Sequence, residues 1–195
     1  MAQMLREGDE LELPAPGVWK VDPAHSSITF SSRYMMLSKI RGRFTHFDAT
    51  IFVAERPQDS WLQAVIDAAS IDTDHPERDE HLRSRDFLRV DVFPTLSFHS
   101  TQVSRVGEAS LEIQGDLTIR DITRPVALEV EFLGVAPDPS GADRAAFVAR
   151  SEIDREDWGI VWNKPLDTGG VLAGKRIEIE IEVQALNRSR EADAA

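Results

Sequence analysis

Apolar and polar side chains alternate along most of this chain from Val18 onward, which is the two-residue period of a half-buried β-strand. The clearest run is KRIEIEIEVQAL, where Ile177, Ile179, Ile181 and Val183 share one face and three glutamates share the other. The same alternation recurs in SITFSSRYM, IRGRF, ATIFVA, TLSFHS, SLEIQGDLTI, VALEVEFL and RAAFVARSEI. Regular strands with turn signals between them predict about eight antiparallel strands, arranged as a sandwich or a barrel.

Two segments depart from this clear alternation. LQAVIDAASIDT has fair helix propensity, but Ala64, Ile66 and Ala68 alternate and the neighbouring segments are strands, so we predict a strand. PERDEHLRSRDFLRV is charged and carries its apolar residues at roughly helical spacing. We therefore predict one short helix at Glu77–Leu88, with Pro76 suited to its first turn.

Small residues occupy several positions on the predicted inward faces. These positions are Ser32, Gly42, Ala68, Gly115, Ala149 and Ser151. Eight strands can close around packed side chains or around one small ligand, and small inward residues leave room for a ligand. The alternative is that aromatic side chains fill this room, namely Phe30, Phe44, Phe98, Trp158 and Trp162.

The segment DREDWGIVWNKP places two tryptophans four residues apart beside a run of charge. Asp154–Asp157 predicts a turn, and a strand starting at Trp158 would place Trp158, Ile160 and Trp162 on one face. We expect Trp158 and Trp162 to line or close one end of an apolar tunnel, with simple core packing as the alternative. Asn163 could orient a polar head or hydrogen-bond a turn.

Composition narrows the possible partners. The 195 residues suffice for one domain with a sizeable core, and the formal net charge is −12. A surface of that sign repels phosphate backbones and anionic lipid headgroups, so we expect binding to neither nucleic acid nor a membrane surface. No apolar run is long enough to span a bilayer, which predicts no membrane insertion. The N-terminal segment lacks the apolar core of a secretory signal, so we expect a cytoplasmic protein.

The chain offers no recognised catalytic or metal-binding motif. It contains no cysteine, which excludes disulfides, thiolate metal sites and cysteine nucleophiles. His75 and His81 are not at a typical metal-ligand spacing. Asp22 and His25 could pair as orienter and base, but no activated nucleophile accompanies them. We therefore predict no catalytic residue, no metal and no cofactor.

Five stretches of the sequence resemble, in the same order, the YceI-like family of lipocalin-shaped, polyisoprenoid-binding proteins. They are WKVDPAHSSITFSSRYM, IRGRFTHFDATI, AASIDTDHPERDEHLRSRDFLRVDVFPTLSFHST, GDLTIRDITRPVALEVEFLG and IDREDWGIVWNKPLDTGG. The resemblance covers roughly residues 18–186. It implies an all-β, lipocalin-like barrel of eight antiparallel strands, with one short helix near a barrel mouth and an elongated apolar tunnel. Residues 1–17 are then expected to form a flexible leader and residues 187–195 a polar tail.

The resemblance also implies a ligand, namely a long-chain isoprenoid, a quinone or a fatty amphiphile, held by a chain that often forms a homodimer. The predicted ligand-binding residues are Phe30, Tyr34, Phe44, Phe87, Phe98, Trp158, Trp162 and Asn163. Members of the family commonly carry a histidine where this chain has Tyr34. A tyrosine keeps a polar group there but cannot become cationic near pH 7, so no headgroup preference is carried over. In the shared signature DEHLRSRDFL, the residues expected to anchor the helix to the barrel are His81, Arg83, Asp86 and Phe87.

Three functions are compatible with these patterns. The favoured one is a binding or carrier protein that holds an apolar chain in the barrel. The second is an enzyme acting on a hydrophobic substrate in the same cavity, with Tyr34 and Asn163, or Asp22 and His25, as acid–base groups. The third is a structural or stress-linked protein whose barrel is filled and binds no ligand.

Overall fold

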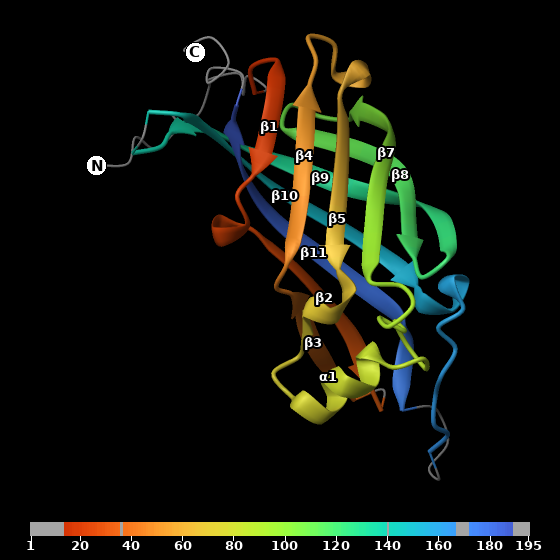
Figure 1. Cartoon of the computed structure of the whole chain (residues 1–195). Coiled ribbons are helices and arrows are strands. Elements are labelled where there is room, and N and C mark those ends of the chain that lie inside the picture. Colours follow the sequence, from red (N-terminus) through yellow and green to blue (C-terminus); the bar gives the residue numbers. More distant parts are fainter. Residues whose placement is uncertain (1–13, 36, 140, 167–171, 189–195) are drawn as a thin grey trace.

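A single antiparallel sheet closes on itself in this computed structural model, which describes residues 14–35, 37–139, 141–166 and 172–188 (Figure 1). Within these residues the strands are β1 (Gly17–Val21), β2 (Ser27–Tyr34), β3 (Ser38–Phe44), β4 (Phe47–Val53), β5 (Trp61–Asp67), β6 (Ile71–Asp72), β7 (Thr95–Arg105), β8 (Ser110–Ile119), β9 (Ile122–Pro137), β10 (Asp143–Asp154) and β11 (Ala173–Asn187). The sheet closes because β1 pairs with β4 on one side and with β11 on the other. The predicted leader and tail lie largely outside the described residues.

Three pairs of consecutive strand segments each form one strand of the barrel. β1 and β2 both pair with β11 and are separated by a short 3-10 turn. β3 continues into β4 after two residues, and β5 continues into β6 after another 3-10 turn. Counted in this way, the described residues form eight antiparallel strands that neighbour one another in chain order. The prediction of an eight-stranded antiparallel barrel with one short helix is confirmed.

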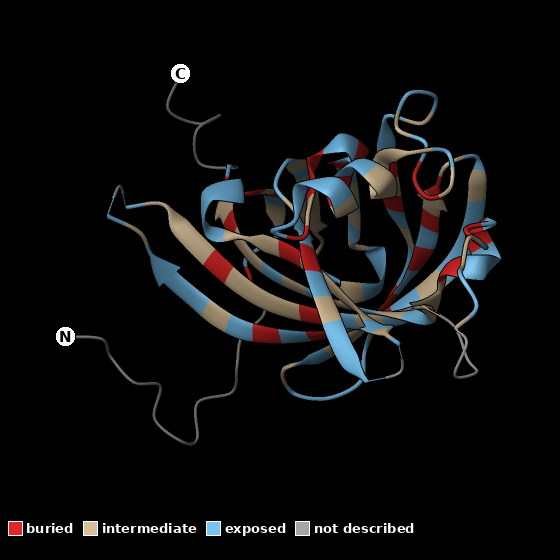
Figure 2. Cartoon of the chain, turned by 90° about the horizontal axis from the view of Figure 1, so that it is seen from below, coloured by how far each residue is buried: buried red, intermediate tan, exposed pale blue. Residues whose placement is uncertain are grey.

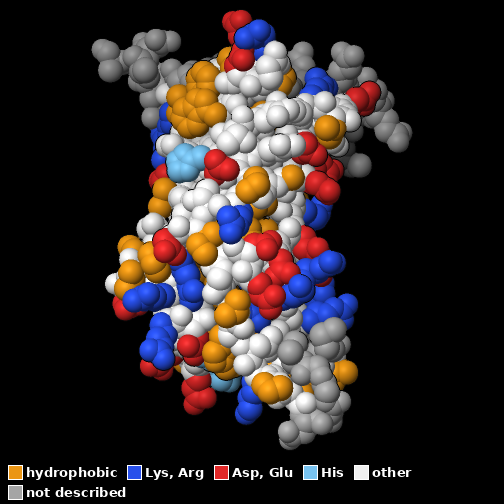
Figure 3. All heavy atoms as spheres, turned by 90° about the vertical axis from the view of Figure 1, so that its right-hand side faces the viewer, with side chains coloured by type: hydrophobic (Ala, Val, Ile, Leu, Met, Phe, Trp, Pro, Cys, Tyr) orange, Lys and Arg blue, Asp and Glu red, His pale blue; other side chains and the backbone are white. Residues whose placement is uncertain are grey.

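The barrel has two distinct ends. At one, here called the helix end, lie α1 (Pro76–Arg83), the β2–β3 turn, the β8–β9 turn and the β10–β11 connection (Figure 1). At the other, here called the hairpin end, the chain turns between β4 and β5, β7 and β8, and β9 and β10. On the face in Figure 3, acidic and basic side chains are interleaved, as the polar members of the alternating pattern require.

The helix begins as predicted and ends earlier. Pro76 occupies the first turn and the His75 side chain caps the helix by accepting a hydrogen bond from the Arg78 amide at 3.4 Å. α1 ends at Arg83 rather than Leu88, because Ser84 adopts an extended ψ of 174° and turns follow it. Phe87 and Leu88 are still buried in the core.

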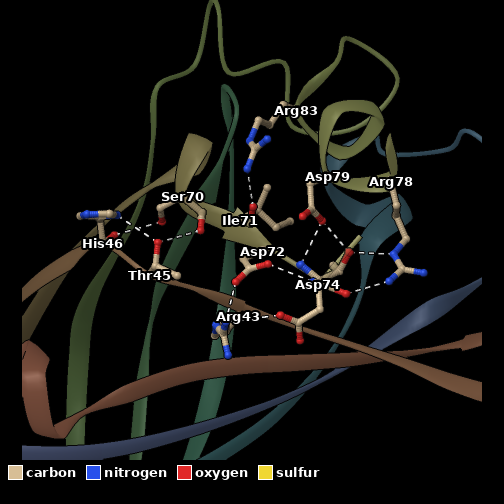
Figure 4. A network of polar contacts seen from close by, with 11 residues as sticks. Arg43, Thr45, His46, Ser70, Ile71, Asp72, Asp74, Arg78, Asp79 and Arg83 are labelled. Carbon is tan, nitrogen blue, oxygen red and sulfur yellow. Dashed lines mark hydrogen bonds and ion pairs between the residues drawn. The ribbon is translucent and has the colours of Figure 1, made fainter. Parts of the chain in front are cut away.

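Hydrogen bonds from charged side chains anchor α1 to the barrel (Figure 4). The buried Asp79 accepts from the amide and hydroxyl of Thr73 at 2.9 and 2.5 Å. Arg83 donates to the carbonyls of Ala69 and Ile71, both at 2.7 Å. The expected anchoring role of Arg83 therefore has a direct structural counterpart.

Two apolar clusters line the interior, and Figure 2 shows buried segments as short bands that recur along the strands. The larger cluster runs along the barrel and includes Phe98, Leu128 and Trp158. The smaller one lies where β1, β9, β10 and β11 meet, around the fully buried Trp19. The Trp19 indole donates to the Ala15 carbonyl at 2.9 Å, so its buried N–H group is satisfied.

Two inward glycines are covered by phenylalanine rings from neighbouring strands. A Cβ added to Gly42 would meet the Phe30 ring at 2.4 Å, and one added to Gly115 would meet the Phe98 ring at 2.4 Å. An aromatic ring that packs over a strand glycine replaces the missing side-chain contacts. At these two positions, therefore, the alternative prediction of aromatic filling is the correct one.

A methyl group at Gly115 should destabilise the barrel. Its Cβ would also meet the His99 carbonyl oxygen at 2.6 Å, and backbone cannot move aside as a side chain can. We expect Gly115→Ala to lower the free energy of unfolding by about 2 kcal/mol, measured by urea denaturation. Gly107→Ala, whose Cβ would meet the Ser110 Cβ at 3.3 Å in an exposed turn, is the matched control and should change it by less than about 1 kcal/mol. Equal losses in the two variants would contradict this packing argument.

Candidate ligand cavity

An internal cavity of about 460 Å³ extends along the barrel between its two ends. At the hairpin end it is lined by Ala54, Pro57 and Ser60 of the β4–β5 connection. In the barrel wall, residues such as Val130 and Ala149 face it from β9 and β10, and at the helix end Tyr34 and Trp162 line it. The volume lies within the range of roughly 300–1,000 Å³ that is typical of small-molecule sites.

Six of the eight predicted ligand-binding side chains line this cavity. They are Phe30, Tyr34, Phe44, Phe87, Phe98 and Trp162. They come from separate parts of the chain, and the barrel brings them together because each lies on an inward face or on the segment that covers the helix end. The Phe30 and Phe44 rings are tilted against each other with centroids 5.7 Å apart. Tyr34 is half-buried, so its phenol lies between the cavity and the surface.

The structure corrects the expected conformation around the two tryptophans. Arg155–Trp158 forms a 3-10 turn, Gly159 follows with a φ of 69°, and no strand begins at Trp158. Trp158 is 2% exposed and its indole donates to the Leu117 carbonyl at 3.1 Å, so it packs into the wall and does not line the cavity. Trp162 alone meets the expectation that the pair lines the tunnel.

Asn163 is occupied by the chain itself. Its amide nitrogen donates to the Ala173 carbonyl at 2.7 Å, and its oxygen accepts from the amides of Lys164 and Ala173 at 3.0 and 3.1 Å. It does not line the cavity. Of the two roles considered for it, the structure supports the hydrogen-bonding of a turn.

The small inward residues have different surroundings. Ser32 and Ala149 line the cavity, as expected of positions that leave room. Ala68 is buried in the larger core, and the Ser151 hydroxyl donates to the Ala127 carbonyl at 2.7 Å. The cavity is thus narrower than the sequence pattern alone indicates.

Polar side chains on the cavity are concentrated at the helix end. At that end they are Ser32, Arg33, Tyr34, Thr73, Arg78, His81 and Arg155, and Thr29 lies further along β2. At the hairpin end Ser60 is the polar residue of the β4–β5 connection that lines the cavity. The cavity therefore has an apolar body and one polar, cationic end.

Arg155 is the most buried of these cations, with 5% of its surface exposed. Its guanidinium donates to the carbonyls of Ile160 at 2.5 Å, Gly174 at 3.1 Å and Ala173 at 3.5 Å, and it lies over the Phe87 ring at 5.9 Å. Burial lowers the pKa of Arg155 from its usual value, and nearby Glu156 opposes that effect. Sequence reasoning missed this residue, because an arginine inside an acidic turn has the pattern of a solvent-exposed one.

His81 packs with aromatic side chains at the helix end of the cavity. Its ring contacts Trp162 and Phe87 edge-on, with centroids 4.5 and 5.0 Å apart. Its Nε2 lies 3.1 Å from a carboxylate oxygen of Asp86. Two of the four residues expected to anchor the helix, His81 and Asp86, therefore contact each other, and His81 also lines the cavity.

The other acid–base pair considered from the sequence does not line the cavity. His25 Nδ1 lies 2.7 Å from Asp22, and Arg144 donates to the same carboxylate oxygen at 2.9 Å. The neighbouring Ser26 hydroxyl exchanges hydrogen bonds with the backbone of Gln184. This arrangement ties the β1–β2 turn to β10 and β11 and offers no nucleophile to a substrate in the barrel.

The Asp22 carboxylate should make the free energy of unfolding depend on pH in the acidic range. Hydrogen bonds from Arg144 and His25 lower the pKa of Asp22, so the folded state favours its ionised form. That contribution is present above the unfolded pKa of about 4 and is lost as the pH falls through the lower folded pKa. We expect Asp22→Asn to cost about 1 kcal/mol of unfolding free energy at pH 7. In an acid-denaturation series this difference should begin to shrink below about pH 4 and vanish once the pH is below the folded pKa of Asp22.

Asp59→Asn provides the control for that experiment, because Asp59 pairs with Arg56 on the exposed surface. Exposed pairs contribute little, so we expect a change below about 0.5 kcal/mol at either pH. A constant Asp22→Asn difference from pH 7 to pH 3 would refute the assignment.

Among the described residues, no group of three or more His, Asp or Glu side chains is placed to hold a metal ion. Among the same residues, no helix has the length and apolar character needed to cross a membrane.

Comparison with known proteins places this barrel in context. The family model described as the YceI-like domain matches residues 19–185. A UPF0312 protein of Shewanella denitrificans is 38% identical over 160 residues, which make up 82% of this chain and 82% of that protein.

Two solved structures have the same fold. BcnA of Burkholderia cenocepacia aligns with a TM-score of 0.72 and 21% identity, over 84% of this chain and 98% of that one. A polyisoprenoid binding domain from Saccharophagus degradans aligns with a TM-score of 0.68 and 13% identity, over 87% of this chain and 98% of that one.

Proposed function

Because the chain belongs to the YceI-like domain family, we propose that it binds one long apolar amphiphile inside its barrel and acts as a binding or carrier protein. The observation that carries the proposal is the cavity of about 460 Å³ that runs between the two ends of the barrel and is lined mainly by aliphatic and aromatic side chains. Apolar walls along most of the cavity favour a hydrocarbon chain over a polar metabolite.

The distribution of polar groups supports one orientation of the ligand. Arg155, Arg78 and His81 all lie at the helix end of the cavity. We propose that the apolar chain extends toward the hairpin end and that an oxygen-bearing head group accepts hydrogen bonds near Arg155 and Tyr34. The desolvated guanidinium of Arg155 favours a head group that is negative or a strong acceptor.

The class of ligand is proposed from likeness. The Saccharophagus degradans domain of the same fold is described as polyisoprenoid binding, which supports an isoprenoid chain here. A quinone or a fatty amphiphile has the same division into an apolar chain and an oxygen-bearing head, so these are the other members of the proposed class. A filled barrel without ligand is disfavoured by the cavity volume.

Native purification tests the proposal. We expect the intact mass under non-denaturing conditions to exceed the sequence mass, and solvent extraction to release an isoprenoid, a quinone or a fatty amphiphile. If the protein carries no small molecule, it is titrated with geranylgeraniol, a ubiquinone and oleate, and saturable one-to-one uptake of one of them is expected. An empty protein that takes up none of the three would overturn the proposal.

A further inference from the structure

The β2–β3 turn at the helix end presents apolar side chains to solvent. Leu37 is 84% exposed, and Met35, also exposed, has a φ of 52°. The Leu37 amide donates to the Tyr34 carbonyl at 3.0 Å and closes the turn. Positive φ at a hairpin turn favours glycine or asparagine, and exposed apolar side chains there add nothing to folding. Neither the conformation nor the stability of the turn therefore explains why Met35 and Leu37 are apolar.

This turn lies beside the place where the cavity reaches the surface, here called its opening, since the exposed Arg33 lines the cavity. The Met35 amide donates to the Leu172 carbonyl at 2.8 Å, and the Leu172 amide donates to the Lys164 carbonyl at 2.9 Å. Tyr34, which lines the cavity, pairs with Ala173, which Asn163 also binds. Val161, 66% exposed, precedes the cavity-lining Trp162. Three exposed apolar residues thus border one opening: Met35, Leu37 and Val161.

Basic side chains surround these apolar residues. Arg33 on β2 lies directly opposite Lys39 on β3, a pairing of like charges that destabilises a sheet on its own. Lys39 is bonded to Glu178, which offsets one of these charges, while Arg33, Arg41 and Lys164 are exposed. This local excess of positive charge contrasts with the chain's net charge of −12.

We propose that this surface docks on an anionic lipid surface. We call it the docking rim, defined by Met35, Leu37, Val161, Arg33, Arg41 and Lys164. Its apolar side chains enter the headgroup layer, and its basic side chains contact the lipid phosphates. The negative charge elsewhere on the protein is repelled by the same lipids, so docking orients the cavity opening toward the membrane. The inference rests on the proposed function, since docking lets the amphiphile pass between the bilayer and the barrel.

Vesicle co-flotation at low ionic strength tests the docking rim. The full chain is mixed with phosphatidylcholine vesicles that either contain or lack phosphatidylglycerol. We expect binding to the anionic vesicles, weakened by about tenfold or more in Arg41→Glu/Lys164→Glu and by about tenfold in Met35→Ser/Leu37→Ser. Added salt should weaken binding of the unmodified protein.

Matched variants at the hairpin end are the controls. Val106 is 65% exposed, and Arg56 is exposed in the β4–β5 connection. Val106→Ser therefore removes an exposed apolar side chain, and Arg56→Glu an exposed positive charge, far from the rim. Both should bind vesicles as the unmodified protein does. The proposal is overturned if the unmodified protein does not bind anionic vesicles, if it binds neutral ones equally, or if rim and control variants lose binding alike.

Uptake of geranylgeraniol, ubiquinone or oleate from solution separates this inference from the proposed function. Rim variants at Met35, Leu37, Arg41 and Lys164 should retain that uptake, because these residues do not line the cavity. Uptake without vesicle binding would overturn the docking rim alone. Vesicle binding without any uptake would overturn the carrier function and leave a lipid-surface-binding protein.

Discussion

Replacing Ala149 with phenylalanine is expected to weaken amphiphile binding by about a hundredfold while leaving the barrel folded. Ala149 lies in the middle of β10, between Val130 of β9 and Ile181 of β11, and its methyl group faces the cavity. A ring at this position would occupy the space through which the apolar chain must run. Protein interiors are close-packed and deform little, so the ring would displace the apolar chain of the ligand. A hundredfold change corresponds to about 2.7 kcal/mol of binding free energy.

Titration with the amphiphile identified by extraction provides the measurement, and thermal denaturation reports the fold. Val148→Phe is the matched control, because Val148 directly precedes Ala149 on the same strand and does not line the cavity. It should bind with unchanged affinity. Unchanged binding by Ala149→Phe would show that the ligand does not occupy the barrel.

Replacing Arg155 with methionine is expected to cost about 3 kcal/mol of stability and to lower Tm by about 9 °C. The buried guanidinium donates to three main-chain carbonyls, those of Ile160, Ala173 and Gly174. Methionine has similar length and restores packing but leaves these carbonyls without their donors. The segment that follows the 3-10 turn would then lose its attachment to the start of β11.

Arg150→Met on the preceding strand is the comparison for Arg155→Met. Arg150 is exposed and pairs with the exposed Glu180 at 3.1 Å, an arrangement that contributes little. We expect its Tm to change by about 2 °C or less. If the two variants melt at the same temperature, the carbonyl bonds of Arg155 do not hold the cavity end together.

The sequence predicts the barrel well because the alternation of apolar and polar residues within each strand shows which side chains face inward. The alternation of Ile177, Ile179 and Ile181 with glutamates identifies an inward and an outward face without any knowledge of neighbouring strands. The same rule places Phe44 and Phe98 on the cavity correctly. Pro76 and the charged segment after it likewise indicate the one helix, because both signals are local.

Features that depend on contacts between distant segments could not be predicted in this way. Strand parity cannot reveal that the Phe98 ring covers Gly115, which makes a small inward residue a filled position. It also fails at Trp158, where a 3-10 turn breaks the two-residue period. The burial of Arg155 depends on carbonyls that follow it in the chain by up to nineteen residues, and no local pattern marks them. Homodimer formation stays a prediction.

The closure of the sheet by β1 and β11 bears on how the chain is made. Trp19 pairs with Asn187, so the strand that completes the ring leaves the ribosome on the order of ten to thirty seconds after the strand it must join. Until then the growing sheet has two open edges and no enclosed interior. The outward glutamates Glu178, Glu180 and Glu182 disfavour pairing of β11 with strands of other chains before the sheet closes. The compartment for a guest molecule thus comes into existence only after β11 has been synthesised and the seam closes.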